Sequence, residues 1–129
     1  MSKTKIYYIV DDDVDDQHFL MDALMENDRS VICYTAANGE EAIANLQNKS
    51  VPVPDVIFLD LNMPRMNGRQ CLAELKHSPD YRNIPVIICS TTSHNDEIRQ
   101  TMENGASYFL VKNSTYSGLK ADLSSIALL

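Results

Sequence analysis

The stretch Asp55-Val-Ile-Phe-Leu-Asp60-Leu-Asn62-Met-Pro64-Arg-Met-Asn67-Gly68 decides the fold of this chain, because an apolar run ends in it at a carboxylate and a turn. The run 56–59 is unbroken and rich in β-branched and aromatic residues, as expected of a parallel strand buried on both faces. Pro64 and the Asn67-Gly68 pair stop a strand or an immediate helix, so a loop follows Asp60. In an open α/β sheet, ligands bind at that edge.

The rest of the chain alternates strand-like and helix-like segments on both sides of this stretch. The expected strands are 5–10, 31–36, 56–59, 84–90 and 107–112, and the expected helices are 16–27, 40–48, 68–77, 95–104 and a last one capped by Thr115 or Ser117. Five strand–helix units predict one α/β domain over 1–129. Its parallel sheet should carry helices on both faces, because each parallel crossover needs a covering helix.

Composition limits the classes of partner. The chain has 129 residues and a formal net charge of −7, which argues against nucleic acid or an anionic membrane surface as the main partner. The apolar run after the first lysines is short and ends in acids, so it predicts neither a signal peptide nor a membrane span, and we expect a cytoplasmic protein. Cys33, Cys71 and Cys89 have no paired metal-ligand spacing, so buried reduced thiols are expected.

Polar residues follow four of the expected strands. Asp11 and Asp12 end the first strand, Asp60 the third, Ser90 the fourth and Lys112 the fifth. Because parallel strands end at the same edge of a sheet, these side chains should converge. Three carboxylates so close repel one another by about 4 kcal/mol per pair at 4 Å and an effective dielectric near 20. Lys112 offsets one charge, and a divalent cation would complete the balance.

Magnesium fits this set of oxygen ligands best, and manganese could take its place. We expect Asp12 and Asp60 as direct ligands, the backbone carbonyl of Asn62 as a third, and Asp11 as a ligand acting through water. Asp13, Asp15 and Asp16 are expected to be solvated acids at a helix start, with Asp13 as a further candidate for the metal site.

Four motifs fall in order along nearly the whole chain: Val10-Asp11-Asp12-Asp13, then Asp60-Leu-Asn62-Met-Pro64 with Gly68, then Pro85-Val-Ile-Ile-Cys-Ser90, then Gly105-Ala-Ser107 leading to Lys112. Together they resemble the receiver domain of two-component response regulators of the single-domain, chemotaxis-regulator-like kind. The resemblance implies a flavodoxin-like (βα)5 doubly wound parallel sheet with strand order 2-1-3-4-5. It also implies magnesium-dependent transfer of a phosphoryl group to Asp60 from a phosphohistidine on a sensor histidine kinase or histidine phosphotransfer protein.

The resemblance also assigns a switch. Lys112 should ion-pair with the phosphoryl group and Ser90 should donate a hydrogen bond to it, moving the loop 91–94. Phe109 stands where the family has its switch aromatic, with a plain core residue as the alternative. The helix 95–104, the fifth strand and the last helix would form the output face for an unidentified downstream protein, in a monomer or a phosphorylation-dependent dimer.

Two departures and two rival classes complete the interpretation. Asn113 follows Lys112 where the family usually has proline, often cis, and no output domain follows the last helix. A haloacid-dehalogenase-like phosphatase would need an acid at position 62, but Asn62 cannot shuttle a proton. A flavodoxin would need a phosphate-binding loop where this chain has Asp11 and Asp12. We therefore expect a phosphoacceptor that assists its own phosphorylation and slow dephosphorylation, not a multiple-turnover enzyme.

Overall fold

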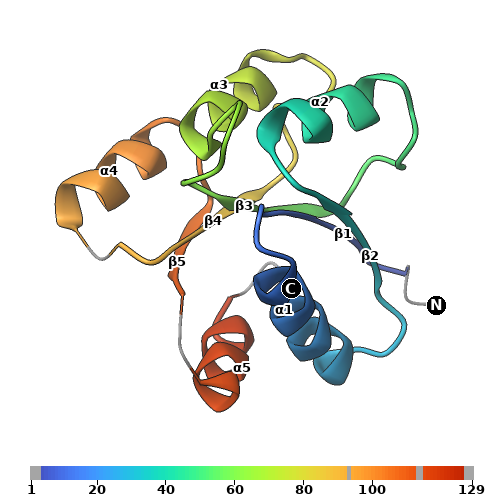
Figure 1. Ribbon diagram of the computed structural model, residues 1–129, viewed down its shortest axis with the longest axis vertical. Helices are drawn as coiled ribbons and strands as arrows, with labels where there is room; N and C mark the ends of the chain where they lie inside the picture. The colour runs from blue at the N-terminus through green and yellow to red at the C-terminus, as the bar shows by residue number, and fades with distance from the viewer. Residues whose placement is uncertain (1–3, 93, 113–114, 127–129) are drawn as a thin grey trace.

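The computed structural model describes residues 4–92, 94–112 and 115–126, and within them strands and helices alternate along the chain (Figure 1). The strands are β1 (Ile6–Val10), β2 (Ile32–Ala36), β3 (Val56–Asp60), β4 (Val86–Ser90) and β5 (Tyr108–Val111). The helices are α1 (Val14–Asn27), α2 (Gly39–Gln47), α3 (Gly68–His77), α4 (Asn95–Glu103) and α5 (Tyr116–Ser124). Each element lies where the sequence pattern predicts it, and no end is shifted by more than two residues.

The strands form one parallel sheet in the order β2-β1-β3-β4-β5, which confirms the predicted flavodoxin-like topology. The register pairs Val10 with Leu59, Asp60 with Cys89, and Ser90 with Val111. The carboxyl ends of β1, β3, β4 and β5 are therefore nearly level. Residues that follow these strands share one edge of the sheet.

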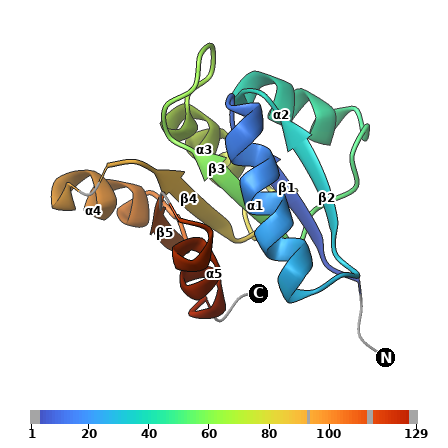
Figure 2. The same cartoon turned by 60° about the horizontal axis from the view of Figure 1, so that its bottom comes forward.

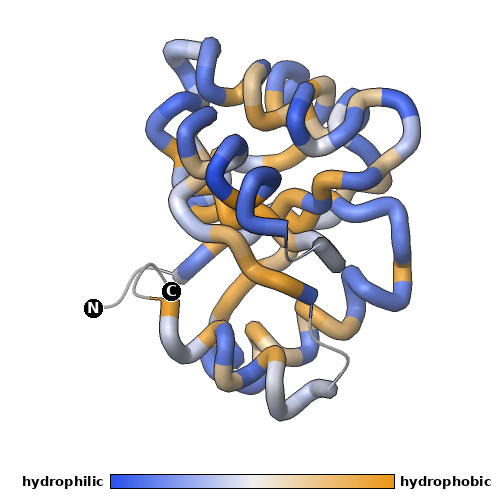
Figure 3. Tube along the Cα trace, turned by 90° about the vertical axis from the view of Figure 1, so that its left-hand side faces the viewer, coloured by the Kyte–Doolittle hydropathy of each residue, from blue (hydrophilic) through white to orange (hydrophobic). Residues whose placement is uncertain are grey.

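Helices cover both faces of the sheet. Figures 1 and 2 show α2, α3 and α4 on one side and α1 and α5 on the other. Successive strand residues point to opposite faces, so Ile57 belongs to the core under α2 and α3, whereas Phe58 belongs to the core under α1 and α5. Every residue of β3 and β4 is buried, as the apolar run predicts. The hydropathy colouring in Figure 3 accordingly runs orange through the centre of the fold and mainly blue along the outer helices.

The first helix begins at Val14, two residues before the predicted start. Asp13 is the N-cap, and its side chain accepts hydrogen bonds from the backbone N–H groups of Asp15 and Asp16. This cap places Asp16 inside the first helical turn rather than at its margin. The shift changes the surroundings of Asp16, as described below.

The cysteines are free thiols, but only two of them match the prediction of burial. Cys71 and Cys89 are buried, and burial raises the pKa of each to about 12. Cys33 is only half-buried, because β2 is an edge strand of the sheet. Among the described residues, no helix combines the length and the apolar character needed to cross a membrane.

Candidate functional site

Asp60 is the last residue of β3, and its surroundings are unusually close-packed. Its side chain is 7% exposed. The first residue of α3, Gly68, donates its N–H to the carbonyl oxygen of Leu61 at 3.0 Å. A Cβ atom at position 68 would lie 2.2 Å from the carbonyl oxygen of Asp60 and 2.6 Å from Cα of Leu61. Glycine is therefore required for α3 to begin this close to Asp60.

Asp11 is held at the end of β1 by three hydrogen bonds. Its N–H donates to the carbonyl oxygen of Ala36 at 3.0 Å, and one of its carboxylate oxygens accepts from the N–H of Asp13 at 3.0 Å. Its own carbonyl oxygen accepts from the side-chain amide of Gln17 at 2.6 Å. Gln17 is buried in α1, so it ties the helix to the strand end that carries the acids.

Asp11, Asp12 and Asp60 bring carboxylate oxygens within 4.8 Å of one another. Asp11 and Asp60 are buried and Asp12 is exposed, so the trio has an open side. Hard oxygen donors with no nitrogen or sulfur ligand suit Mg²⁺ or Mn²⁺, and the mutual repulsion of the acids favours such a cation. The donor set therefore fits the divalent metal that the sequence predicts.

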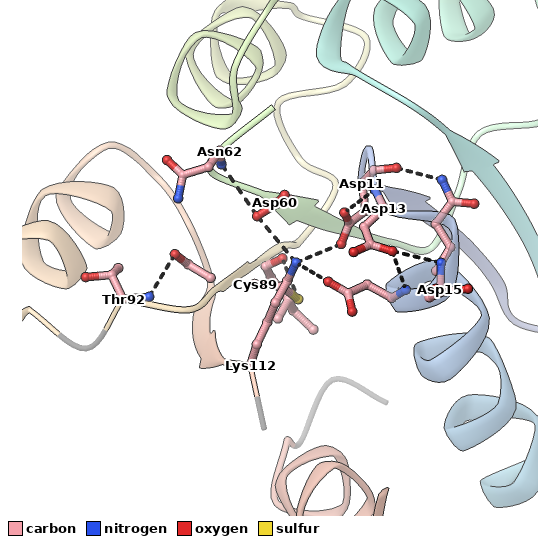
Figure 4. A network of polar contacts seen from close by, with 12 residues as sticks. Asp11, Asp13, Asp15, Asp60, Asn62, Cys89, Thr92 and Lys112 are labelled. Atoms are coloured by element: carbon pink, nitrogen blue, oxygen red, sulfur yellow. Dashed lines mark hydrogen bonds and ion pairs between the residues drawn. The ribbon is translucent and has the colours of Figure 1, made fainter. Parts of the chain in front are cut away.

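Asn62 lies beside these acids. Its backbone N–H is 3.5 Å from Oδ1 of Asp60, at the outer limit of a hydrogen bond. The contact puts the start of the loop next to the carboxylates (Figure 4). A ligand role for the Asn62 carbonyl stays a prediction.

Lys112 reaches into the same cluster from the end of β5 (Figure 4). Its Nζ atom lies 3.0 Å from Oδ2 of Asp11 and 3.7 Å from Oδ1 of Asp60. Its backbone N–H donates to the carbonyl oxygen of Ser90 at 2.7 Å, which fixes the strand end but not the long side chain. The structure thus brings Asp11, Asp60 and Lys112 together from three separate strands.

Asp16 lies in the first turn of α1 with its side chain 43% exposed, as predicted for a helix-start acid, but the sequence did not predict its contact with Lys112. Its Oδ2 atom lies 2.9 Å from Nζ of Lys112, closer than either of the acids predicted to share that ammonium. With Asp12 included, the cluster contains four carboxylates and one ammonium, which lies within 3.7 Å of three of them. Three negative charges are left uncompensated, rather than the two expected from the sequence.

Burial and neighbouring charges shift the pKa values in this cluster. Burial raises the pKa of Asp60 to about 6 against the opposing pull of Lys112, and the charges of Asp11 and Asp12 add to the rise. Burial also raises the pKa of Asp11, although the Asp13 N–H and Lys112 oppose it. Burial alone would lower the pKa of Lys112, but hydrogen bonds to Asp16 and Asp11 outweigh it and raise that pKa. The lysine is therefore cationic.

Ser90 ends β4 one residue beyond Cys89, the register partner of Asp60. Its side chain is fully buried, and its Oγ accepts a hydrogen bond from the N–H of Thr92 at 3.2 Å (Figure 4). Ser90 thereby connects the edge next to Asp60 with the start of the loop that leads to α4. Ser93, within that loop, lies outside the described residues.

Phe109 is partly buried and packs against the core under α2 and α3. This position is compatible with both sequence hypotheses, a switch aromatic and a core residue. The bond between Lys112 and Asn113, where the family often has a cis proline, lies outside the described residues.

Sequence reasoning missed two residues that hold the site together, Asp16 and Gln17. Both carried a signal in the helical spacing. Asp16 lies four residues before Leu20 and Gln17 lies three before it, so both fall on the inward side of α1. A buried amide on an apolar stripe indicates a hydrogen-bond partner, here the carbonyl oxygen of Asp11.

Comparisons with known proteins agree with this geometry. A family model described as the response regulator receiver domain matches residues 8–124. Response regulator Rcp1 from Synechocystis sp. is 29% identical over 119 residues, which are 89% of this chain and 81% of Rcp1. In several other relatives the matching region is less than a third of a longer protein.

Solved structures with the same fold include close matches. The phosphorylated cyanobacterial phytochrome response regulator RcpA matches with a TM-score of 0.86 at 30% identity, covering 94% of this chain and 89% of that one. The Mn²⁺-bound form of Rcp1 matches at 0.84 and 27%, covering 94% and 93%. The CheX–CheY–BeF3–Mg²⁺ complex from Borrelia burgdorferi matches at 0.79 and 29%, covering 94% and 87%.

The parallel sheet, the three acids at its edge and the family match over residues 8–124 lead to one assignment. Receiver domains are phosphoacceptor modules that interact with histidine kinases or phosphotransfer proteins, and they are not turnover enzymes. This chain belongs to the response regulator receiver domain family of two-component signalling.

Proposed function

We propose that residues 1–129 act as one receiver domain in which Asp60 accepts a phosphoryl group from a phosphohistidine. The observation that carries the proposal is the cluster at the sheet edge. Asp60 lies 3.7 Å from the Lys112 ammonium, and carboxylate oxygens of Asp11 and Asp12 lie within 4.8 Å of its own. A carboxylate nucleophile, a cation-binding acid pair and a neighbouring ammonium are the groups that phosphoryl transfer to an aspartate needs.

Asp60 is the nucleophile in this proposal because it is the buried carboxylate at the end of β3 that lies near both the Lys112 ammonium and the acid pair Asp11 and Asp12. One of its oxygens attacks phosphorus in line. The O–P bond forms as the P–N bond to the donor imidazole breaks, and the imidazole nitrogen keeps that electron pair and takes up a proton. With a pKa raised to about 6, Asp60 is mostly ionised at neutral pH and can react as a nucleophile.

Asp11, Asp12 and Asp60 would hold Mg²⁺ or Mn²⁺, with the carbonyl of Asn62 as a further ligand. When bound, the cation would neutralise carboxylate charge and the charge on phosphoryl oxygens. The open side at Asp12 leaves room for ligands from outside the chain. Manganese in the Rcp1 structure and magnesium in the CheY complex support this choice of ion.

Lys112 and Ser90 would stabilise the phosphorylated state. The Lys112 ammonium lies close enough to Asp60 to pair with a phosphoryl oxygen after a small shift. The Ser90 hydroxyl, which accepts from Thr92 in the resting state, can rotate its own O–H toward the phosphoryl group. Its movement would draw Thr92 and the rest of the loop toward the site.

Helix α4 is suited to respond to such a movement. Thr101 is its only buried residue, so little apolar packing holds the helix against the sheet. An ion pair between Arg69 of α3 and Glu97 ties its first turn to the neighbouring helix. We propose that phosphorylation shifts the loop after β4 and changes the face formed by α4, β5 and α5, with Phe109 turning inward.

The partners in this proposal are a sensor histidine kinase or histidine phosphotransfer protein as donor, and a downstream protein that reads the changed face. The kinase obtains its phosphoryl group from ATP, so we place the exchange in the cytoplasm. The complex of the CheY relative with CheX, BeF3 and Mg²⁺ supports binding of the receiver domain by another protein.

The test is incubation with acetyl phosphate and Mg²⁺ followed by intact-mass measurement. We expect the wild type to gain one phosphoryl group and Asp60→Asn to gain none. Asp55→Asn is the matched control, because it makes the same change at the residue just before β3. The Asp55 side chain accepts a hydrogen bond from the N–H of Ile6 and is not one of the clustered acids. It should still be phosphorylated. A wild type that gains no mass, or an Asp60→Asn variant that gains it, would contradict the proposal.

A further inference from the structure

We propose that Asp16 is a positioning residue for Lys112: its carboxylate, carried by the first turn of α1, holds the lysine ammonium at the place from which it acts on the phosphoryl group. The inference rests on the proposed function for the role of Lys112, but the contact itself does not. Asp16 is neither a predicted metal ligand nor a plain solvated acid in this arrangement.

The distances make Asp16 a full partner of the lysine. Nζ of Lys112 lies 2.9 Å from Asp16, 3.0 Å from Asp11 and 3.7 Å from Asp60, so two of the three contacts are hydrogen bonds. The Lys112 side chain is 21% exposed and the Asp16 side chain 43%, so the pair sits at the rim of the site, partly shielded from water. A charge-assisted pair in that setting keeps more of its strength than a surface pair.

Asp16 is itself held firmly. The N-cap Asp13 accepts a hydrogen bond from the Asp16 N–H at 3.2 Å, and the next residue, Gln17, donates to the carbonyl oxygen of Asp11 at 2.6 Å. The start of α1 is thereby attached to the end of β1. A carboxylate on that turn has a fixed position relative to the acids of the site.

Packing does not locate the Lys112 side chain in the same way. A cavity of about 50 Å³ adjoins it, with apolar walls from α1, α5 and the sheet and with Asp11, Asp16 and Lys112 along its polar side. The walls include Phe19, Leu110 and Leu119. A side chain that borders empty space can change rotamer at little cost, so the carboxylates that bind its ammonium decide where it points.

Asp16 differs from Asp11 and Asp60, the other two carboxylates near Lys112, because it is not among the acids that can hold a metal ion. Asp11 and Asp60 belong to the group of acids that can hold a metal ion, and Asp60 is the proposed phosphoryl acceptor. Once those acids are engaged, their hold on the lysine weakens. Asp16 lies outside that group and can keep the ammonium at the rim in both states.

The experiment compares Asp16→Asn with Asp15→Asn in the full chain. Both variants remove one negative charge from the first turn of α1, but only Asp16 contacts Lys112, whereas Asp15 is exposed. The first measurement is the ¹⁵N NMR signal of the Lys112 ammonium, assigned with Lys112→Gln and recorded without metal or phosphoryl donor. That signal is seen when a lasting ion pair slows proton exchange. We expect the same signal in the wild type and in Asp15→Asn, and faster proton exchange with a broadened signal in Asp16→Asn, where Asp11 is the remaining hydrogen-bond partner.

The second measurement is the initial rate of phosphorylation by acetyl phosphate in Mg²⁺. A displacement of 1 Å costs up to about 10²-fold in rate, and Asp11 still holds the ammonium, so we expect a loss of about 3- to 10-fold in Asp16→Asn. Asp16→Glu, which keeps the charge, should recover most of the rate. In a Lys112→Gln background, Asp16→Asn should change the rate less than about 1.5-fold, because its effect passes through the lysine.

The outcomes separate this inference from the proposed function. It is overturned if the Lys112 ammonium protons exchange as slowly in Asp16→Asn as in the wild type, if Asp15→Asn has the same effect as Asp16→Asn, or if Asp16→Asn slows the Lys112→Gln protein equally. A wild type that takes no phosphoryl group refutes the proposed function and, with it, the role of the ion pair in transfer. The NMR comparison still decides whether Asp16 holds the lysine.

Discussion

The substitution Gly68→Ala tests how closely α3 must approach the phosphoryl-acceptor strand. The added Cβ would meet the backbone of Asp60 at 2.2 Å and that of Leu61 at 2.6 Å, whereas ordinary contacts begin near 3.4 Å. Neither obstacle is a flexible side chain. The start of α3 must therefore retreat from β3 by about 1 Å, or the end of β3 must move by as much.

Overpacking of this kind costs about 1–3 kcal/mol, and a clash with backbone atoms that cannot rotate away belongs in the upper part of that range. We expect the free energy of unfolding to fall by about 2–3 kcal/mol, which lowers the midpoint of thermal unfolding by roughly 6–12 °C for a domain of this size. Because Asp60 moves with the strand end, phosphorylation should slow by about 10- to 100-fold.

Urea unfolding gives the change in stability, and intact-mass measurement with acetyl phosphate and Mg²⁺ gives the rate. Gly118→Ala is the control, since it adds the same methyl group within α5, away from the acids, where alanine favours the helix by up to about 1 kcal/mol. The reasoning is refuted if Gly68→Ala unfolds within about 0.5 kcal/mol of the wild type and is phosphorylated at the same rate.

Three further predictions concern the acids and their supports. Burial raises the pKa of Asp60 above its unfolded value to about 6, so the folded chain binds the extra proton between about pH 4 and pH 6 and stability falls as pH rises through that window. Asp60→Asn should therefore stabilise the metal-free protein by about 1–3 kcal/mol at pH 7.5 and by much less at pH 4, as read from urea unfolding in EDTA; an equal gain at both pH values would contradict this. Gln17→Ala leaves the carbonyl oxygen of Asp11 without its side-chain donor, so the free energy of unfolding measured in urea should fall by about 1–3 kcal/mol. An unchanged free energy would show that Gln17 does not stabilise the end of β1. Mg²⁺ at 100 times its dissociation constant should stabilise the wild type by about 2.7 kcal/mol, seen as a rise in the thermal midpoint, and Asp12→Asn should remove most of that rise; an unchanged rise would exclude Asp12 as a ligand.

Much of the fold could be predicted because the sequence pattern and the sheet geometry agree. The buried runs before Asp60 and Ser90 indicate central parallel strands, and their carboxyl ends must then share an edge. The convergence of Asp11, Asp60 and Lys112 follows from that topology without knowledge of any side-chain contact. What topology cannot supply is the direction of a long side chain, and the partner of Lys112 was therefore incompletely predicted.

The position of Asp16 depended on where α1 begins. Five aspartates between positions 11 and 16 offer several N-caps. The hydrogen bonds from the N–H groups of Asp15 and Asp16 to Asp13 select the earlier start. Because helix ends are read from a pattern only to within about two residues, the pattern alone could not decide which of these acids touches Lys112.

The balance of charge supports the proposed switch. Burying Asp60 and Asp11 in a cluster of four carboxylates and one ammonium raises the free energy of the metal-free fold, and the pKa of each is raised, mainly by burial and further by the neighbouring acids. The packing of the sheet offsets this cost, because β3 and β4 are buried along their whole length. Little apolar packing holds α4, in contrast, so a change of charge at Asp60 meets least resistance there. The electrostatic cost is thus concentrated at the end of a fully buried strand, near a helix that has little apolar packing.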